Sequence, residues 1–261
     1  MSLQYTANEY AIPRGRIFFD RFDSAGARTG EQAFGNCPGF TFTTETTKAE
    51  HYSSEGGLRE KDAALTIEVN RSGELTCDNF STRNFALFVS GVAEMQTQAA
   101  ATVVDEAMAV KQGLFYQIGA TQTNPAGARN ITAVTVKDST GTTPFVLGTD
   151  FNLDPALGRL QIIEGGGIVD DVTVKLGYTT AVASWERVKS GSVSEVSGAM
   201  RIIADNASGA NRDWYFPKVT LTSSGDIPVI AEGTDFVQMK FGVEILKPAN
   251  QEALYVDGRP I

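Results

Sequence analysis

The sequence predicts a mainly β protein, in which a small inserted β-sandwich interrupts a larger antiparallel β-sandwich or half-barrel with one flanking α-helix. Two observations predict this class. Short segments rich in Val, Ile, Thr and Phe alternate apolar with polar residues, and the 26 glycines gather in turn-like clusters between them. The 261 residues, 42% of them hydrophobic, suffice for one large or two modest domains with a buried core.

Three segments of the larger domain show the alternation of a strand. In residues 40–43, phenylalanine alternates with threonine. In residues 65–70, Leu65, Ile67 and Val69 alternate with Thr66, Glu68 and Asn70, which is typical of a sheet with one wet face. Residues 236–246 place five apolar side chains on one face: Val237, Met239, Phe241, Val243 and Ile245. We expect the apolar face of each strand to lie against the core.

One segment has the spacing of a helix. Asp78 or Ser81 can cap it, and Gly91 stands where it would end. Between them, Phe80, Arg83, Asn84, Leu87 and Phe88 recur at helical spacing. Residues 99–110 are rich in alanine but contain Thr102-Val103-Val104, which favours a strand followed by a loop.

Two stretches are expected to be loops. Residues 44–62 are charged and carry Gly56-Gly57 at their centre, and a loop of this length in a compact domain is usually functional or disordered. Its charges are mixed in sign: Glu45, Lys48, Glu50, Glu55, Arg59, Glu60 and Lys61. Residues 119–129, with Asn124-Pro125 and Gly127, are typical of a linker.

After this linker, short strands follow one another at the spacing of a small β-sandwich. We expect strands at residues 133–137, 143–147, 159–163 and 172–176, with turns at 139–141, 154–158 and 165–167. A second linker-like stretch covers residues 179–184. The predicted organisation is a first part of the main domain at 1–118, an inserted domain at 119–184 and a second part of the main domain at 185–261.

The residues offer little catalytic or metal chemistry. His51 is the only histidine, and a catalytic dyad would need it beside Cys37. Residues 150–154 have the Asp-x-Asn-x-Asp spacing of a calcium loop but lack its glycine and its glutamate at the twelfth position. Gly165-Gly166-Gly167 lacks the Lys-Ser/Thr of a phosphate loop and favours a hairpin turn. We therefore expect no enzyme, no cofactor and no metal.

Charge and segment composition exclude further classes. The net charge of −9 argues against tight binding of nucleic acid, which depends on basic side chains. The start of the sequence lacks the basic and apolar regions of a secretory signal, and no apolar run is long enough for a membrane span. We expect synthesis in the cytoplasm, with Cys37 and Cys77 reduced.

The order of these motifs resembles a tail tube protein (major tail protein) of long, non-contractile-tailed bacteriophages. The similar segments are residues 15–19, 34–42, 50–57, 75–91, 198–202, 214–221 and 236–247. Residues 149–154, 158–162 and 172–178 resemble small immunoglobulin-like modules that recur in phage tail proteins. Together the two likenesses cover nearly the whole chain, although they contain no invariant signature residue.

The resemblance implies a virion protein that forms hexameric rings, which stack into a tube for DNA ejection. The segment 44–62 would reach the next ring through Glu45, Lys48, Glu50, Glu55, Arg59 and Glu60. Thr41, Thr43, Glu45, Thr66, Glu68 and Asn70 would face the lumen, where DNA passes without specific binding, while Phe40, Phe42, Leu65, Ile67 and Val69 would face the core. Partners would be further copies and the tail terminator, tape-measure and baseplate proteins.

Alternatives stay open for each of these assignments. The charged segment is otherwise a disordered loop, and the polar set is otherwise an ordinary solvated face. For the whole protein, the alternatives are a capsid decoration or baseplate protein, or a glycan-binding β-sandwich with Trp185 or Trp214 as the platform for sugar stacking.

Overall fold

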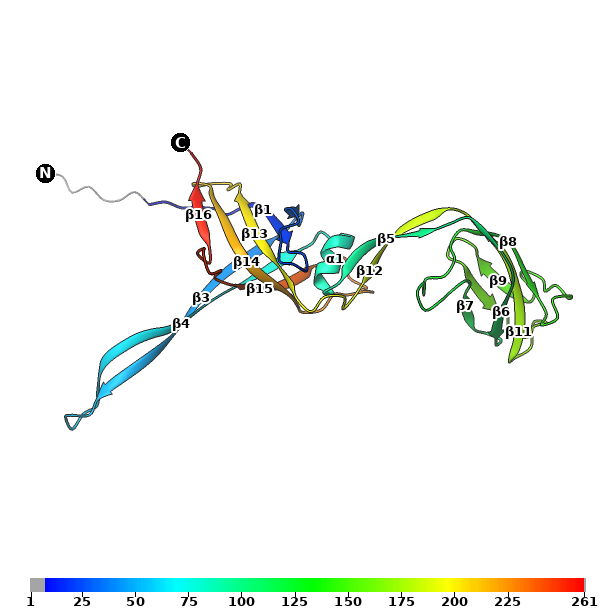
Figure 1. The fold of residues 1–261 in the computed structure, drawn as a ribbon, viewed down its shortest axis with the longest axis horizontal. Helices are drawn as coiled ribbons and strands as arrows, with labels where there is room; N and C mark the ends of the chain where they lie inside the picture. Colours follow the sequence, from blue (N-terminus) through cyan, green and yellow to red (C-terminus); the bar gives the residue numbers. More distant parts are fainter. Residues whose placement is uncertain (1–7, 261) are drawn as a thin grey trace. The chain divides into compact units, whose positions relative to one another are not determined.

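The computed structural model describes residues 8–260, shown in Figure 1. These residues are mainly β, with several antiparallel sheets and one α-helix, which confirms the predicted class. The chain divides into two compact units, the first formed by the residues up to Glu94 and from Val188 onward, and the second by Met95–Arg187. None of the helical residues in the described part forms a helix long and apolar enough to cross a membrane.

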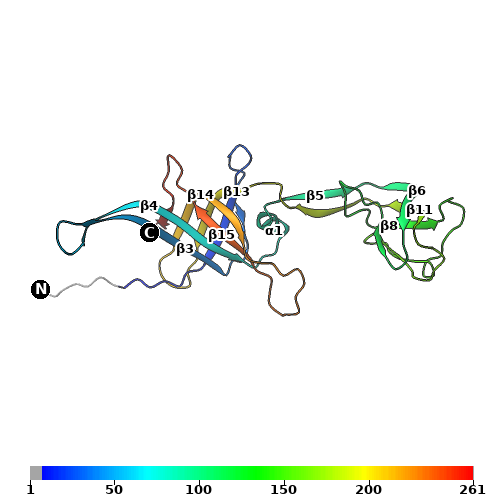
Figure 2. The same ribbon diagram turned by 90° about the horizontal axis from the view of Figure 1, so that it is seen from below.

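The first unit is built on an eight-stranded antiparallel sheet (Figure 2). Its strands follow the order β2 (Gln32–Ala33), β1 (Gly15–Arg21), β13 (Val196–Ala204), β14 (Arg212–Ser224), β15 (Met239–Ile245), β4 (Glu60–Cys77) and β3 (Gly39–Ser53). The short strand β16 (Tyr255–Gly258) pairs with the first residues of β14. Strand β3 therefore forms one edge of the sheet.

The core of this unit confirms the alternation predicted near the end of the chain. Met239, Phe241, Val243 and Ile245 are buried along β15. The strand starts at Met239, later than expected, and Phe236 is exposed. Aromatic rings fill the interior, since Phe34 lies edge-on to Phe241 with ring centroids 5.7 Å apart.

The helix forms where the sequence predicts it. Helix α1 covers Thr82–Phe88, and the Ser81 hydroxyl caps it by accepting a hydrogen bond from the Asn84 backbone N–H at 3.2 Å. The Gly91 N–H donates to the Ala86 carbonyl at 2.7 Å and ends the last turn. Asn84 is buried, and its side chain donates to the carbonyls of Phe34 and Asn79. The helix is thus fixed to the first unit by hydrogen bonds as well as by packing.

The second unit contains two three-stranded antiparallel sheets that share one hydrophobic core. One sheet has the order β7 (Phe115–Gln117), β10 (Arg159–Ile162) and β9 (Phe151–Asp154), and the other β6 (Ala101–Val110), β11 (Val172–Thr180) and β8 (Ile131–Lys137). Strands β5 (Val92–Gln98) and β12 (Ala183–Lys189) pair with each other as a two-stranded sheet.

Two details of this unit differ from the sequence-based expectation. The unit begins at Met95 and not near residue 119, because β6 pairs along its length with β11 and β7 pairs with β10. Residues 143–147 do not form a strand and make only isolated bridges. The Asp138 carboxylate accepts hydrogen bonds from the backbone N–H groups of Thr142 and Thr143, which holds this segment as a turn.

Candidate assembly surface

A long β-hairpin made of β3 and β4 extends from the sheet of the first unit (Figure 1). Their pairing runs from Gly39 opposite Thr76 to Ser53 opposite Glu60, and a turn at residues 54–59 joins the strands. The expectation of a loop at 44–62 is therefore wrong over most of its length. Threonine and tyrosine favour strands, and Gly56-Gly57 supplies the turn, so the charged segment forms a ribbon (Figure 1).

The hairpin has a root inside the sheet and a distal part outside it. Strand β15 covers β4 from Met239 opposite Cys77 to Glu244 opposite Ser72. Beyond Ser72, β4 pairs only with β3 among the described strands. We call residues 44–53 and 60–71, with their turn, the distal hairpin. It is a two-stranded ribbon whose two faces are both open to solvent.

The apolar residues of the distal hairpin do not face a core, which corrects the expectation for them. Leu65 is 69% exposed and Ile67 is 61% exposed, and Val69 is exposed as well. Phe40 and Phe42, at the root, do pack against the buried cluster of the first unit. The strand pattern is the same in both parts, but only the root has a second layer to pack on.

A bulge divides the predicted polar face. Thr47 pairs with Glu68 and Lys48 with Thr66, so Ile67 has no partner in β3. By this register, Glu68 and Asn70 share a face with Glu45 and with the exposed Thr41 and Thr43. Thr66 lies on the opposite face, with Lys48, which separates it from the set it was predicted to join.

The side chains near the tip are held by local contacts. Lys61 forms an ion pair with Glu50, and the Tyr52 hydroxyl donates to Glu50 at 2.9 Å. These bonds, first that from Lys61, lower the pKa of Glu50, and the bond to Glu50 raises the pKa of Tyr52. The Arg59 guanidinium lies 5.3 Å from the centre of the Tyr52 ring. The tip is therefore a charged surface whose side chains contact one another.

The residues predicted to contact a neighbouring ring are spread along this ribbon. Glu45, Lys48 and Glu50 lie on β3, Glu55 and Arg59 in the turn, and Glu60 at the start of β4. All of them are exposed. Their side chains are therefore accessible to another molecule, and the ring contact itself stays a prediction.

The candidate catalytic dyad and the candidate calcium loop have structural roles instead. His51 contacts Asp62 at 2.5 Å on the distal hairpin, while Cys37 lies beside Cys77 at the root, so the two do not form a dyad. The Cys77 thiol and burial raise the pKa of Cys37. The Asp150 carboxylate accepts the N–H groups of Val146 at 2.7 Å and Gly167 at 2.8 Å, which lowers its pKa.

Both tryptophans pack against neighbouring side chains. Trp214 stacks on Phe216 and contacts Phe42, while Arg129 lies over Trp185 at 5.3 Å from the ring centre. Within residues 8–260, no group of three His, Cys, Asp or Glu side chains is placed to hold a metal ion.

Sequence reasoning missed a groove of about 960 Å³ in the first unit. Phe40, Phe42 and Trp214 line it together with residues of the segment before β1 and of the turn between β13 and β14. No local motif marks it, because its walls come from segments far apart in the sequence.

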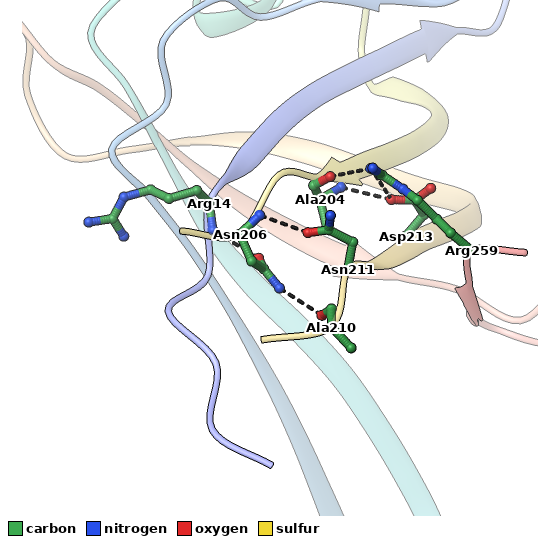
Figure 3. A network of polar contacts seen from close by, with 7 residues as sticks. All are labelled: Arg14, Ala204, Asn206, Ala210, Asn211, Asp213 and Arg259. Atoms are coloured by element: carbon green, nitrogen blue, oxygen red, sulfur yellow. Dashed lines mark hydrogen bonds and ion pairs between the residues drawn. The ribbon is translucent and has the colours of Figure 1, made fainter. Parts of the chain in front are cut away.

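A network of hydrogen bonds fixes one wall of this groove (Figure 3). The Arg14 backbone N–H donates to Asn206 at 3.1 Å, and the Asn206 N–H donates to the Asn211 side chain at 2.7 Å. The Asp213 carboxylate accepts the Ala204 N–H at 2.8 Å, and this bond, with Arg259, lowers its pKa. The segment before β1 is thereby attached to the β13–β14 turn.

A family model described as "Protein of unknown function UCP028589" matches residues 10–185. The match covers more than half of the chain, including the whole hairpin, and the chain belongs to this family. A search of curated proteins found no match.

Proposed function

We propose that the chain is a structural virion protein that self-assembles into stacked hexameric rings and forms the tail tube of a bacteriophage, the conduit for DNA ejection. One observation carries this proposal. The distal hairpin exposes Leu65 and Ile67, and among the described strands no third one supports it. A lone two-stranded hairpin is marginally stable in water, whereas additional strands stabilise it. Neighbouring copies would supply those strands.

The free edge of β3 supports association through the backbone. Strand β3 is the last strand of its sheet, so the N–H and C=O groups on its outer side have no strand partner within the described residues. Such an edge is a template for pairing with another chain. Mixed charges along it, such as Glu45 and Lys48, favour one register and orientation over others.

The polar face of the hairpin suits a conduit for DNA. Thr41, Thr43, Glu45, Glu68 and Asn70 share this face by register and carry no positive charge. Phosphates gain affinity for a protein through basic side chains, which release counterions when they bind. A wall made of this face would therefore repel the duplex weakly and would not retain it.

The same proposal places the chain among other virion components. The tail terminator and baseplate proteins would cap the two ends of the tube, and a tape-measure protein would lie inside it before ejection. The second unit would decorate the tube, and the protein would be made in the host cytoplasm before assembly.

Negative-stain electron microscopy of the purified chain, before and after concentration, tests the proposal. We expect rings or hollow tubes with a central hole wide enough for a DNA duplex. A variant in which residues 47–68 are replaced by an Asn-Gly turn should keep its near-UV circular dichroism and form neither. Uniform monomers of the unaltered chain at every concentration, or tubes formed by the shortened variant, would contradict the proposal.

A further inference from the structure

The loop between β14 and β15 presents an unusual apolar surface. Residues 225–238 carry Val229, Ile230 and Phe236, each 89–94% exposed. Ile227, at the start of the loop, packs against the core of the first unit and anchors it. Scattered exposed apolar residues are common, but three large ones in a single loop indicate a contact surface.

The same loop has a one-sided charge. Asp226, Glu232 and Asp235 are exposed, and residues 225–238 contain no lysine or arginine. None of the three carboxylates takes part in an ion pair within the described part of the chain. A partner for this loop therefore needs an apolar floor and free positive charges.

The groove described above has both features. Phe40, Phe42 and Trp214 supply aromatic surface, and Arg14 and Arg16 lie at its rim. Both arginines are exposed, and neither forms an ion pair within residues 8–260. Glu9, Asp205 and Arg212 also line the groove, and Glu9 pairs with Arg212 at 3.0 Å. Asp205 forms no ion pair within residues 8–260 either, so two free arginines and one free carboxylate remain for a ligand.

The loop lies outside the groove of its own chain. Val229, Ile230 and Phe236 are exposed, and no residue of the loop lines the groove. Part of the groove wall is nevertheless close to the base of the loop, because Lys240 pairs with Thr76, and Thr76 pairs with Gly39, which lines the groove. The test must therefore distinguish a contact between two copies from a contact within one chain.

We propose that the loop of residues 225–238 of one copy docks into this groove of a second copy. Val229, Ile230 and Phe236 would cover Phe40, Phe42 and Trp214, and the acidic side chains would face Arg14 and Arg16. The contact joins two unlike surfaces, so it repeats head to tail and gives a ring when the rotation closes. This inference rests on the proposed function, because both require copies of the chain to associate.

Photo-cross-linking tests which surface meets the loop. The full chain with p-benzoylphenylalanine in place of Phe236 is concentrated, irradiated and analysed by mass spectrometry. We expect a cross-link between two copies, with the adduct on residues 9–16, 36–42 or 202–214. Adducts confined to one copy, adducts on residues 95–187, or the absence of any cross-linked dimer would overturn the inference. A groove occupied by another segment of its own chain would also prevent the dimer and would equally overturn the inference.

Charge exchange provides a second readout by sedimentation velocity. Glu232→Lys with Asp235→Lys should weaken association at least about tenfold, as should Arg14→Glu with Arg16→Glu. All four changes in one chain should restore it. If each double variant associates more weakly and the fourfold variant does not regain association, the result would count against the docking.

Apolar substitutions separate this inference from the proposed function. Val229→Ser with Ile230→Ser and Phe236→Ser should abolish association, whereas the matched triple Val146→Ser, Leu147→Ser and Val169→Ser, on exposed positions of the second unit, should not. Tubes formed by the loop triple would overturn the docking and leave the tail tube proposal intact. Head-to-tail dimers that respond to the charge exchange but never build tubes would support the docking and count against the tail tube.

Discussion

The two ends of strand β4 follow the same sequence pattern in different surroundings. Leu75, at the root, is fully buried between β15 and β3, with the Phe34–Phe241 pair in the same core cluster. Leu65, ten residues earlier on the same strand, lies mostly in solvent. Alternation of apolar and polar residues predicts a strand in both places, but burial also requires a second layer within the same chain. An apolar strand without that layer indicates a partner.

The largest expected effect comes from truncating an apolar side chain at the buried end of β4. Leu75→Ala should lower the free energy of unfolding by about 2–5 kcal/mol, because it removes a packed side chain and leaves a cavity. Leu65→Ala, the same change on the same strand, should leave this free energy within about 0.5 kcal/mol in the monomer. Urea unfolding of both variants below the association concentration measures the difference. Equal losses would mean that the distal hairpin has a packing layer within its own chain.

The sequence alone predicts the position of those elements whose signals lie within a few neighbouring residues. Ser81 and Gly91 bracket helix α1 as predicted, and the alternation from Met239 to Ile245 matches the burial of β15. The charged residues of segment 44–62 indicate a solvated segment and therefore favour a loop. The segment forms strands because β3 and β4 pair with each other on either side of the turn at residues 54–59. The bulge at Ile67 moves Thr66 to the other face of the hairpin. It depends on how β3 and β4 pair, and no sequence motif marks it. The groove is likewise formed by distant segments.

A smaller effect is expected from the buried amide of Asn84, which lies on helix α1 beside Cys77 at the root of the hairpin. The Asn84 side chain donates to the Phe34 carbonyl at 2.8 Å and to the Asn79 carbonyl at 2.9 Å. Asn84→Ala removes these bonds in a buried site and should cost about 1–3 kcal/mol of unfolding free energy. The matched change is Asn70→Ala on the distal hairpin, where the side chain bonds the exposed Glu68. A loss for Asn70→Ala equal to that for Asn84→Ala would contradict the distinction between root and distal part.

Acid titration extends the comparison to carboxylates. The backbone N–H of Ala204, followed by Arg259, lowers the pKa of Asp213 in the folded chain. A lowered folded pKa contributes stability above the unfolded pKa of about 3.9, and this stability is lost as the pH falls below it. Asp213→Asn should therefore flatten the decline of the urea midpoint between about pH 4.5 and 2.5. Glu50→Gln, at the exposed tip, should change this slope less, and a larger change for Glu50→Gln would show that the tip contributes to monomer stability.

The smallest expected effect on the monomer accompanies a large effect on assembly. Ile67→Ser combined with Val69→Ser replaces two exposed side chains, so the free energy of unfolding should stay within about 0.5 kcal/mol. Val69 pairs with Thr46, on the face opposite to Glu45 and Asn70, and Ile67 lies in the bulge. In an assembled tube both side chains would be covered, and each is worth roughly 1.5–3 kcal/mol when it leaves water, so rings and tubes should be lost. Electron microscopy and urea unfolding of the same preparation measure both quantities. A stable variant that still forms tubes would mean that the apolar residues of the distal hairpin are not part of the assembly surface.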